Sequence, residues 1–112
     1  TVRRYFPGQA IALHLDSAEL FEEPVMFVVL CACETGAGLV FRPMGQSMEE
    51  SEKRSEVFRV NEATGLSLCI SGSARYDWGH EVPPVSTLRL SMTWRWYKAG
   101  VDDAQGLLLP GL

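Results

Sequence analysis

Apolar and polar residues form short alternating or clustered segments along this chain, and these segments predict β-strands. The longest apolar run, residues 25–33, is rich in β-branched side chains. This pattern is typical of a strand that is buried on both faces at the centre of a core. A glycine-bearing turn over residues 34–38 follows it, so residues 39–42 are expected to return as its hairpin partner.

The rest of the chain repeats this pattern of short strands and turns. Residues 17–24 are expected to be a loop or one helical turn, and the polar, acidic residues 44–53 an exposed loop or a short helix. The remaining predicted strands are residues 9–16, 55–60, 66–71, 74–80 and 88–97. Strands spaced by roughly eight to twelve residues, with almost no helical period, predict an all-β sandwich or barrel. A jelly-roll barrel would suit a metal site, because inward-facing positions of different strands converge in a rigid cavity.

The last predicted strand has the clearest pattern. Every even position of residues 87–96 is apolar and every odd position is polar, so one face is expected to pack against the core. The other face collects Thr87, Arg89, Ser91, Thr93 and Arg95. This polar face either meets water or lines a barrel cavity. In a cavity the two arginines need anionic partners, which a dicarboxylate would supply, and at roughly 20 Å apart they would serve different ends of the site.

A histidine and a carboxylate lie two residues apart at the end of the first apolar segment. In an extended backbone, His14 and Asp16 point to the same side and can converge on one point. The second histidine of the chain, His80, comes just before the turn signal Pro83-Pro84. Two histidines and one carboxylate form the face that leaves open positions on a non-haem iron. The alternative is an ordinary strand-end pair and an unrelated, partly buried histidine.

Length and composition limit the possible function classes. The 112 residues suffice for one domain, and no apolar run approaches the roughly 18 residues of a membrane span. Three cysteines, Cys31, Cys33 and Cys69, cannot all pair within the chain, so we expect reduced thiols and an intracellular protein, cytoplasmic or nuclear. The net charge of −4 argues against a free-standing nucleic-acid binder. Since the chain starts at Thr1, we expect a fragment of a longer protein.

Three motifs follow one another in a recognisable order. They are Tyr5-x-Pro7-Gly8-x-x-Ile11-x-x-His14-x-Asp16, then Gly72-x-Ala74-Arg75-Tyr76-x-Trp78-x-His80, then Arg89-x-Ser91-x-Thr93-x-Arg95. Together they resemble the catalytic core of the AlkB-type iron(II) and 2-oxoglutarate-dependent dioxygenases. The resemblance extends from Tyr5 to about Trp96, and three ordered motifs are more specific than any one of them.

The resemblance implies a fold and a set of site residues. The fold would be a double-stranded β-helix with little helix, formed by residues 1–100 and followed by a tail over residues 101–112. The implied iron ligands are His14, Asp16 and His80, and the implied cosubstrate residues are Tyr5, Arg89, Ser91 and Arg95. Arg89 would hold the distal carboxylate of 2-oxoglutarate, and Arg95 would lie close to the iron-binding aspartate.

The resemblance also implies an activity and its substrates. Family members use iron(II), 2-oxoglutarate and molecular oxygen to oxidise alkyl groups on nitrogen, which are released as an aldehyde. The expected substrate is a base in RNA first, alkylated DNA second and a protein side chain third, with no membrane partner. Arg3 stands where the family often has asparagine, and the N-terminal lid region of the family is expected to precede this chain. A cupin-like metal-binding barrel and a catalytically silent interaction module are the alternatives.

Overall fold

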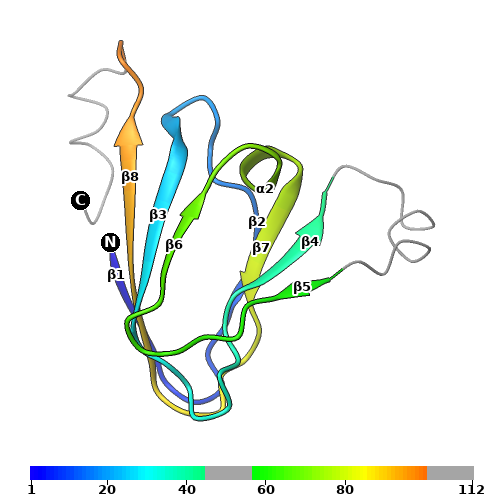
Figure 1. The fold of residues 1–112 in the computed structure, drawn as a ribbon, viewed down its shortest axis with the longest axis vertical. Helices are drawn as coiled ribbons and strands as arrows, with labels where there is room; N and C mark the ends of the chain where they lie inside the picture. Colours follow the sequence, from blue (N-terminus) through cyan, green and yellow to red (C-terminus); the bar gives the residue numbers. More distant parts are fainter. Residues whose placement is uncertain (45–56, 101–112) are drawn as a thin grey trace.

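The computed structural model describes residues 1–44 and 57–100 and is all-β, as the strand pattern predicts (Figure 1). Two four-stranded antiparallel sheets form two layers. The first sheet has the order β1 (Val2–Tyr5), β8 (Arg89–Tyr97), β3 (Phe21–Cys31) and β6 (Ser67–Ile70). The second has the order β2 (Ile11–His14), β7 (Trp78–Val82), β4 (Val40–Pro43) and β5 (Phe58–Arg59). Of the helices that this part of the chain forms, none is long and apolar enough to cross a membrane.

The core lies between the two sheets. Its buried apolar side chains come from both layers and include Tyr5, Val25, Phe27, Val29, Phe41, Ile70 and Val82. The prediction that residues 25–33 are buried on both faces is wrong. Along β3, buried Val25, Phe27 and Val29 alternate with more exposed residues, and Leu30 is 39% exposed. The second sheet covers only the inner face of β3, so the period-two geometry of a strand separates the two sets.

Residues 39–42 do not form a hairpin with β3, contrary to the sequence prediction. The strand there, β4, belongs to the other sheet and pairs with β7 and β5. The glycine-bearing turn carries the chain from one layer to the other, with Gly36 at φ +75° and its carbonyl accepting from the Glu62 amide. Leu39, Val40 and Phe41 are thereby buried between the layers. The burial of these residues favours the crossover over a two-stranded hairpin.

The strand predicted over residues 74–80 is two elements instead. A single helical turn, α2 (Ser73–Tyr76), closes with the Asp77 amide donating to the Ser73 carbonyl, and β7 begins at Trp78. His80 therefore lies inside a strand rather than at its end. Residues 55–60 were also predicted as one strand, of which β5 covers only two residues. The predicted loop or short helix at residues 44–53 and the tail at 101–112 lie, except for Met44, outside the described residues.

The last predicted strand is present as β8, but its apolar face points outward. Arg89 and Ser91 are 0% and 3% exposed, whereas Leu88, Trp94 and Trp96 are 39%, 43% and 48% exposed. Ser91 pairs with Val29, Thr93 with Phe27 and Arg95 with Val25, so the odd positions share the inward face of β3. The expectation that the apolar face packs against the core is wrong. The polar face lies inside, because its arginines find carboxylates there.

Candidate metal centre

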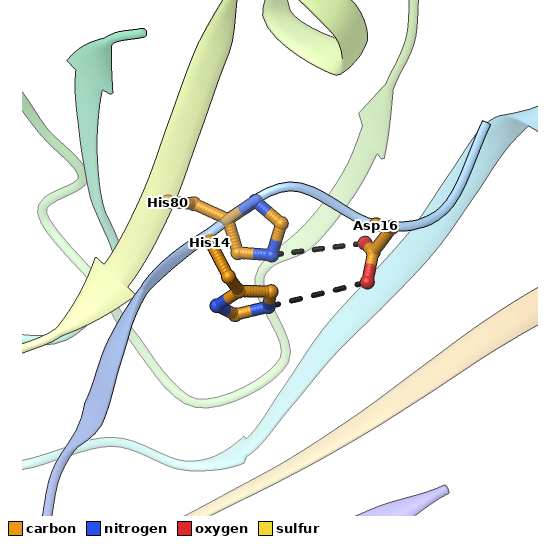
Figure 2. A group of neighbouring side chains, drawn as sticks. All are labelled: His14, Asp16 and His80. Carbon is orange, nitrogen blue, oxygen red and sulfur yellow. Dashed lines mark ion pairs between the residues drawn. The ribbon is translucent and has the colours of Figure 1, made fainter.

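The second sheet brings the two histidines together. His14 ends β2 and pairs directly with His80 on β7, and their ring centroids lie 4.3 Å apart. Asp16 follows in the loop after β2 and faces both rings (Figure 2). One ligand atom from each of the three residues lies within 4.8 Å of the other two. The arrangement can therefore hold one metal ion with two imidazole nitrogens and a carboxylate oxygen.

Asp16 offers one oxygen that has no partner in the protein. Its Oδ1 accepts from Arg95, at 3.1 Å from Nε and 3.0 Å from Nη2. Its Oδ2 lies 3.7 Å from His80 Nε2, is buried and has no hydrogen bond. It is the one such side-chain atom among residues 1–44 and 57–100. An unpaired buried carboxylate oxygen is unfavourable, so this atom fits a role as a cation ligand.

Both imidazoles are suited to bind a cation. His14 Nδ1 lies 2.8 Å from the Ala12 carbonyl and donates a hydrogen bond to it, so Nε2 is the ring nitrogen directed toward Asp16. Burial lowers the pKa of His80 from 6.5 to about 4. The Asp16 carboxylate opposes this shift, whereas His14 and Arg95 add to it. His80 is therefore neutral at neutral pH, the form that binds metals.

The lowered pKa of His80 predicts a pH-dependent stability of the metal-free protein. Between pH 6.5 and about 4 the unfolded chain binds a proton at His80 that the folded chain does not. The contribution of His80 to the free energy of unfolding is therefore fully present above pH 6.5. It decreases as the pH falls through this window, by at most about 3 kcal/mol. Urea unfolding of wild type and His80→Gln at pH 7.5 and 4.5 measures the difference. Equal losses in both proteins would contradict the prediction.

A buried arginine fixes the loop that carries Asp16. Arg75, from α2, donates to the carbonyls of Asp16, Ser17 and Glu23 at 2.6, 3.1 and 3.1 Å. It is only 3% exposed, and its three backbone acceptors explain why a charge is tolerated there. The sequence places Arg75 in the second motif without a role. Its function follows from the helical turn, which the strand pattern did not predict.

A cavity lined by both polar and apolar side chains opens beside the candidate metal centre, between the two sheets. His14 and His80 line it from the second sheet, and Arg3, Tyr5, Ser91 and Arg95 line it from the first. Five of the residues that the resemblance assigns to the cosubstrate or the metal thus share one space with a further arginine, Arg3. Arg95 lies against Asp16, as the resemblance implies. Arg89, the expected partner of the distal carboxylate, does not line the cavity.

Arg89 is instead paired within the protein. Its Nε and Nη2 donate to the two oxygens of Glu62 at 2.7 and 2.8 Å, and both side chains are fully buried. Burial alone would lower the pKa of Arg89, but the hydrogen bonds and charge of Glu62 outweigh it and raise the pKa. Glu62 also accepts from the Leu39 amide at 3.1 Å. A Cβ at Gly38 would overlap the Glu62 carboxylate, so glycine is needed there.

The chain matches no protein-family model and no curated protein sequence. The candidate site therefore rests on its own geometry and on the three motifs. The sequence does not mark Glu62 as a site residue. It lies in an apparent turn, Asn61 to Gly65, where no pattern of apolar residues indicates that it is buried.

A second cavity, of about 340 Å³, is apolar and shares Ile70 with the lining of the first. Trp78, Phe41 and Phe58 line it, and Trp78 also packs against the core. Tyr76 is 39% exposed and lines neither cavity. The histidines and arginines of the candidate site line the first cavity and not the second.

Proposed function

We propose that this protein is an AlkB-like iron(II) and 2-oxoglutarate-dependent dioxygenase that removes methyl or other alkyl groups from nitrogen. The observation that supports it most is the convergence of His14, Asp16 and His80 beside a cavity lined by the polar face of β8. The proposal includes a double-stranded β-helix as the complete fold of residues 1–100. The two antiparallel sheets are compatible with that architecture.

The three ligands fit iron(II). Two neutral imidazoles and one carboxylate are the donor set of non-haem iron oxygenases, and the unpartnered Asp16 Oδ2 is the atom that a divalent cation would satisfy. When bound, iron(II), 2-oxoglutarate and molecular oxygen supply the oxidation, with succinate and carbon dioxide as coproducts. The protein contributes geometry. Arg95 holds Asp16 Oδ1, and Arg75 holds the loop, so that Oδ2 stays directed toward His80.

The cavity residues bind and orient the cosubstrate in this proposal. Tyr5 and Ser91 are 4% and 3% exposed, and both line the cavity, so their hydroxyl groups are available to the carboxylates of a 2-oxo acid. A cupin-like barrel would also use such ligands, but it would not require the arginines that face this cavity. A silent interaction module would require neither the unpartnered Asp16 oxygen nor a neutral His80 beside it.

The proposed substrate is an alkylated nitrogen in a nucleic acid or in a protein. A base in RNA is the first choice, alkylated DNA the second and a protein side chain the third, because the family acts on all three. The net charge of −4 disfavours extensive phosphate contacts by this chain. We propose an intracellular location, cytoplasmic or nuclear, because the three cysteines cannot all pair within the chain.

The proposed function predicts turnover that depends on His14. Wild type incubated with iron(II), ascorbate and 2-oxoglutarate is expected to form succinate, and His14→Ala is expected to form none above background, because the substitution removes a metal ligand. Leu15→Ala, which truncates the exposed neighbouring side chain, is the matched control and should retain the wild-type rate. Equal succinate formation by wild type and His14→Ala would refute the dioxygenase proposal.

A further inference from the structure

The ion pair of Arg89 and Glu62 changes the charge of the proposed cosubstrate site. Two hydrogen bonds join the side chains, and neither is exposed. The pair is therefore electrically neutral before any ligand binds. A third charged group, the distal carboxylate of a 2-oxo acid, would leave this buried cluster with one uncompensated negative charge. Such a charge is strongly unfavourable away from water unless another cation joins it.

Arg3 is the cation that the cavity offers. It lies on β1 directly opposite Ser91, and Tyr5 lies opposite Arg89, so all four residues share the inward face of the first sheet. Arg3 lines the cavity together with Tyr5 and Ser91. No ion pair of Arg3 is present among residues 1–44 and 57–100. The other cavity arginine, Arg95, is already bound to Asp16.

The position of Arg3 along the first sheet also favours it over Arg89. Along the inward face of β8, Ser91 lies between Arg95, which contacts the metal ligand Asp16, and the buried Arg89. Its partner Arg3 is therefore closer to the metal ligands along the strand than Arg89 is. A flexible guanidinium there can form a bidentate pair with a carboxylate.

We infer that Arg3, with Tyr5 and Ser91, binds the distal carboxylate of the cosubstrate. Arg89 does not bind this carboxylate, because its guanidinium is already paired with Glu62. The inference rests on the proposed function. It differs from the resemblance, which assigns the distal carboxylate to Arg89 and has asparagine in the place of Arg3. The site is thus selective for a dianionic 2-oxo acid through a residue on an edge strand.

Selectivity between two ligands tests the inference. Calorimetric titration of the Mn(II)-loaded protein compares 2-oxoglutarate with 2-oxobutyrate, which shares the 2-oxo acid end and lacks the distal carboxylate. Wild type is expected to bind 2-oxoglutarate at least about tenfold more tightly, the effect of one charge-assisted hydrogen bond. Arg3→Gln should lose this preference and Arg3→Lys should retain part of it. Arg4→Gln, which alters the neighbouring arginine on the opposite face of β1, should behave as wild type.

A second substitution tests the role of Glu62. In the Arg3→Gln background, Glu62→Gln removes the charge that neutralises Arg89, so part of the preference for 2-oxoglutarate should return. Circular dichroism establishes that each variant is folded. An Arg3→Gln protein that binds Mn(II) and keeps the wild-type preference would overturn the assignment to Arg3 and leave the dioxygenase proposal standing. Absence of 2-oxoglutarate binding by Mn(II)-loaded wild type would overturn both.

Discussion

Asp16→Asn is expected to weaken the binding of Mn(II) or iron(II) at least about 100-fold, since even an outer-shell substitution at a metal site costs 10–100-fold. The variant keeps the size of the side chain and loses its negative charge. Asp16 Oδ2 is the buried oxygen without a partner, and Arg95 already occupies Oδ1. The substitution therefore removes the atom that the protein leaves available for a cation.

Metal-induced stabilisation provides the measurement. At a metal concentration of 100 times Kd, wild type should gain about 2.7 kcal/mol of stability, which appears as a rise in Tm. Asp16→Asn, if its Kd is at least about 100-fold higher, should gain at most about 0.4 kcal/mol at the same concentration. Glu19→Gln, at an exposed position of the same loop, is the control and should respond as wild type. A Tm rise in Asp16→Asn equal to that of wild type would show that the metal binds elsewhere.

Glu62→Ala is expected to destabilise the fold by about 3–5 kcal/mol, the range for removing one partner of a buried ion pair. The substitution leaves the Arg89 guanidinium in the core without a counter-charge, and the Leu39 amide without its acceptor. The free energy of unfolding should fall with an unchanged denaturant dependence, because the buried area stays similar.

A double substitution separates the loss of the pair from the loss of one partner. Glu62→Leu with Arg89→Met replaces both charges by apolar groups, which in buried pairs is often neutral or stabilising. The double variant should therefore be more stable than Glu62→Ala in urea unfolding. If the double variant is no more stable than Glu62→Ala, the single substitution does not leave Arg89 as an uncompensated charge, and the prediction is wrong.

Sequence patterns predicted the strands best where alternating or apolar residues are bounded by turn residues. Residues 66–71 and 88–97 appear as β6 and β8. The strand predicted over residues 9–16 is shorter, because β2 ends at His14 and Asp16 lies in the loop that follows. The period of a strand does not reveal which face lies inside. The apolar face of β8 was therefore expected inside, although it lies outside. Hydrophobicity does not indicate the buried face here, because the two arginines of the polar face have carboxylate partners in the interior.

Partners that are distant in sequence account for most of what the sequence could not predict. Glu62 reaches Arg89 across 27 residues, and Arg75 reaches Asp16 across 59. Neither contact leaves a local pattern, since both glutamate and arginine are usually exposed. The crossover from β3 to β4 was missed for a similar reason, because a glycine turn fits a hairpin and a crossover equally well.

The inward polar face of β8 also has a consequence for folding. A slip of one residue would turn Leu90, Met92 and Trp94 inward and the arginines outward, the arrangement that hydrophobicity alone favours. The ion pairs of Arg89 and Arg95 form only in the observed alignment. Glu62 and Asp16 therefore act against a misaligned strand, and loss of either would favour kinetic trapping during folding as well as an altered site.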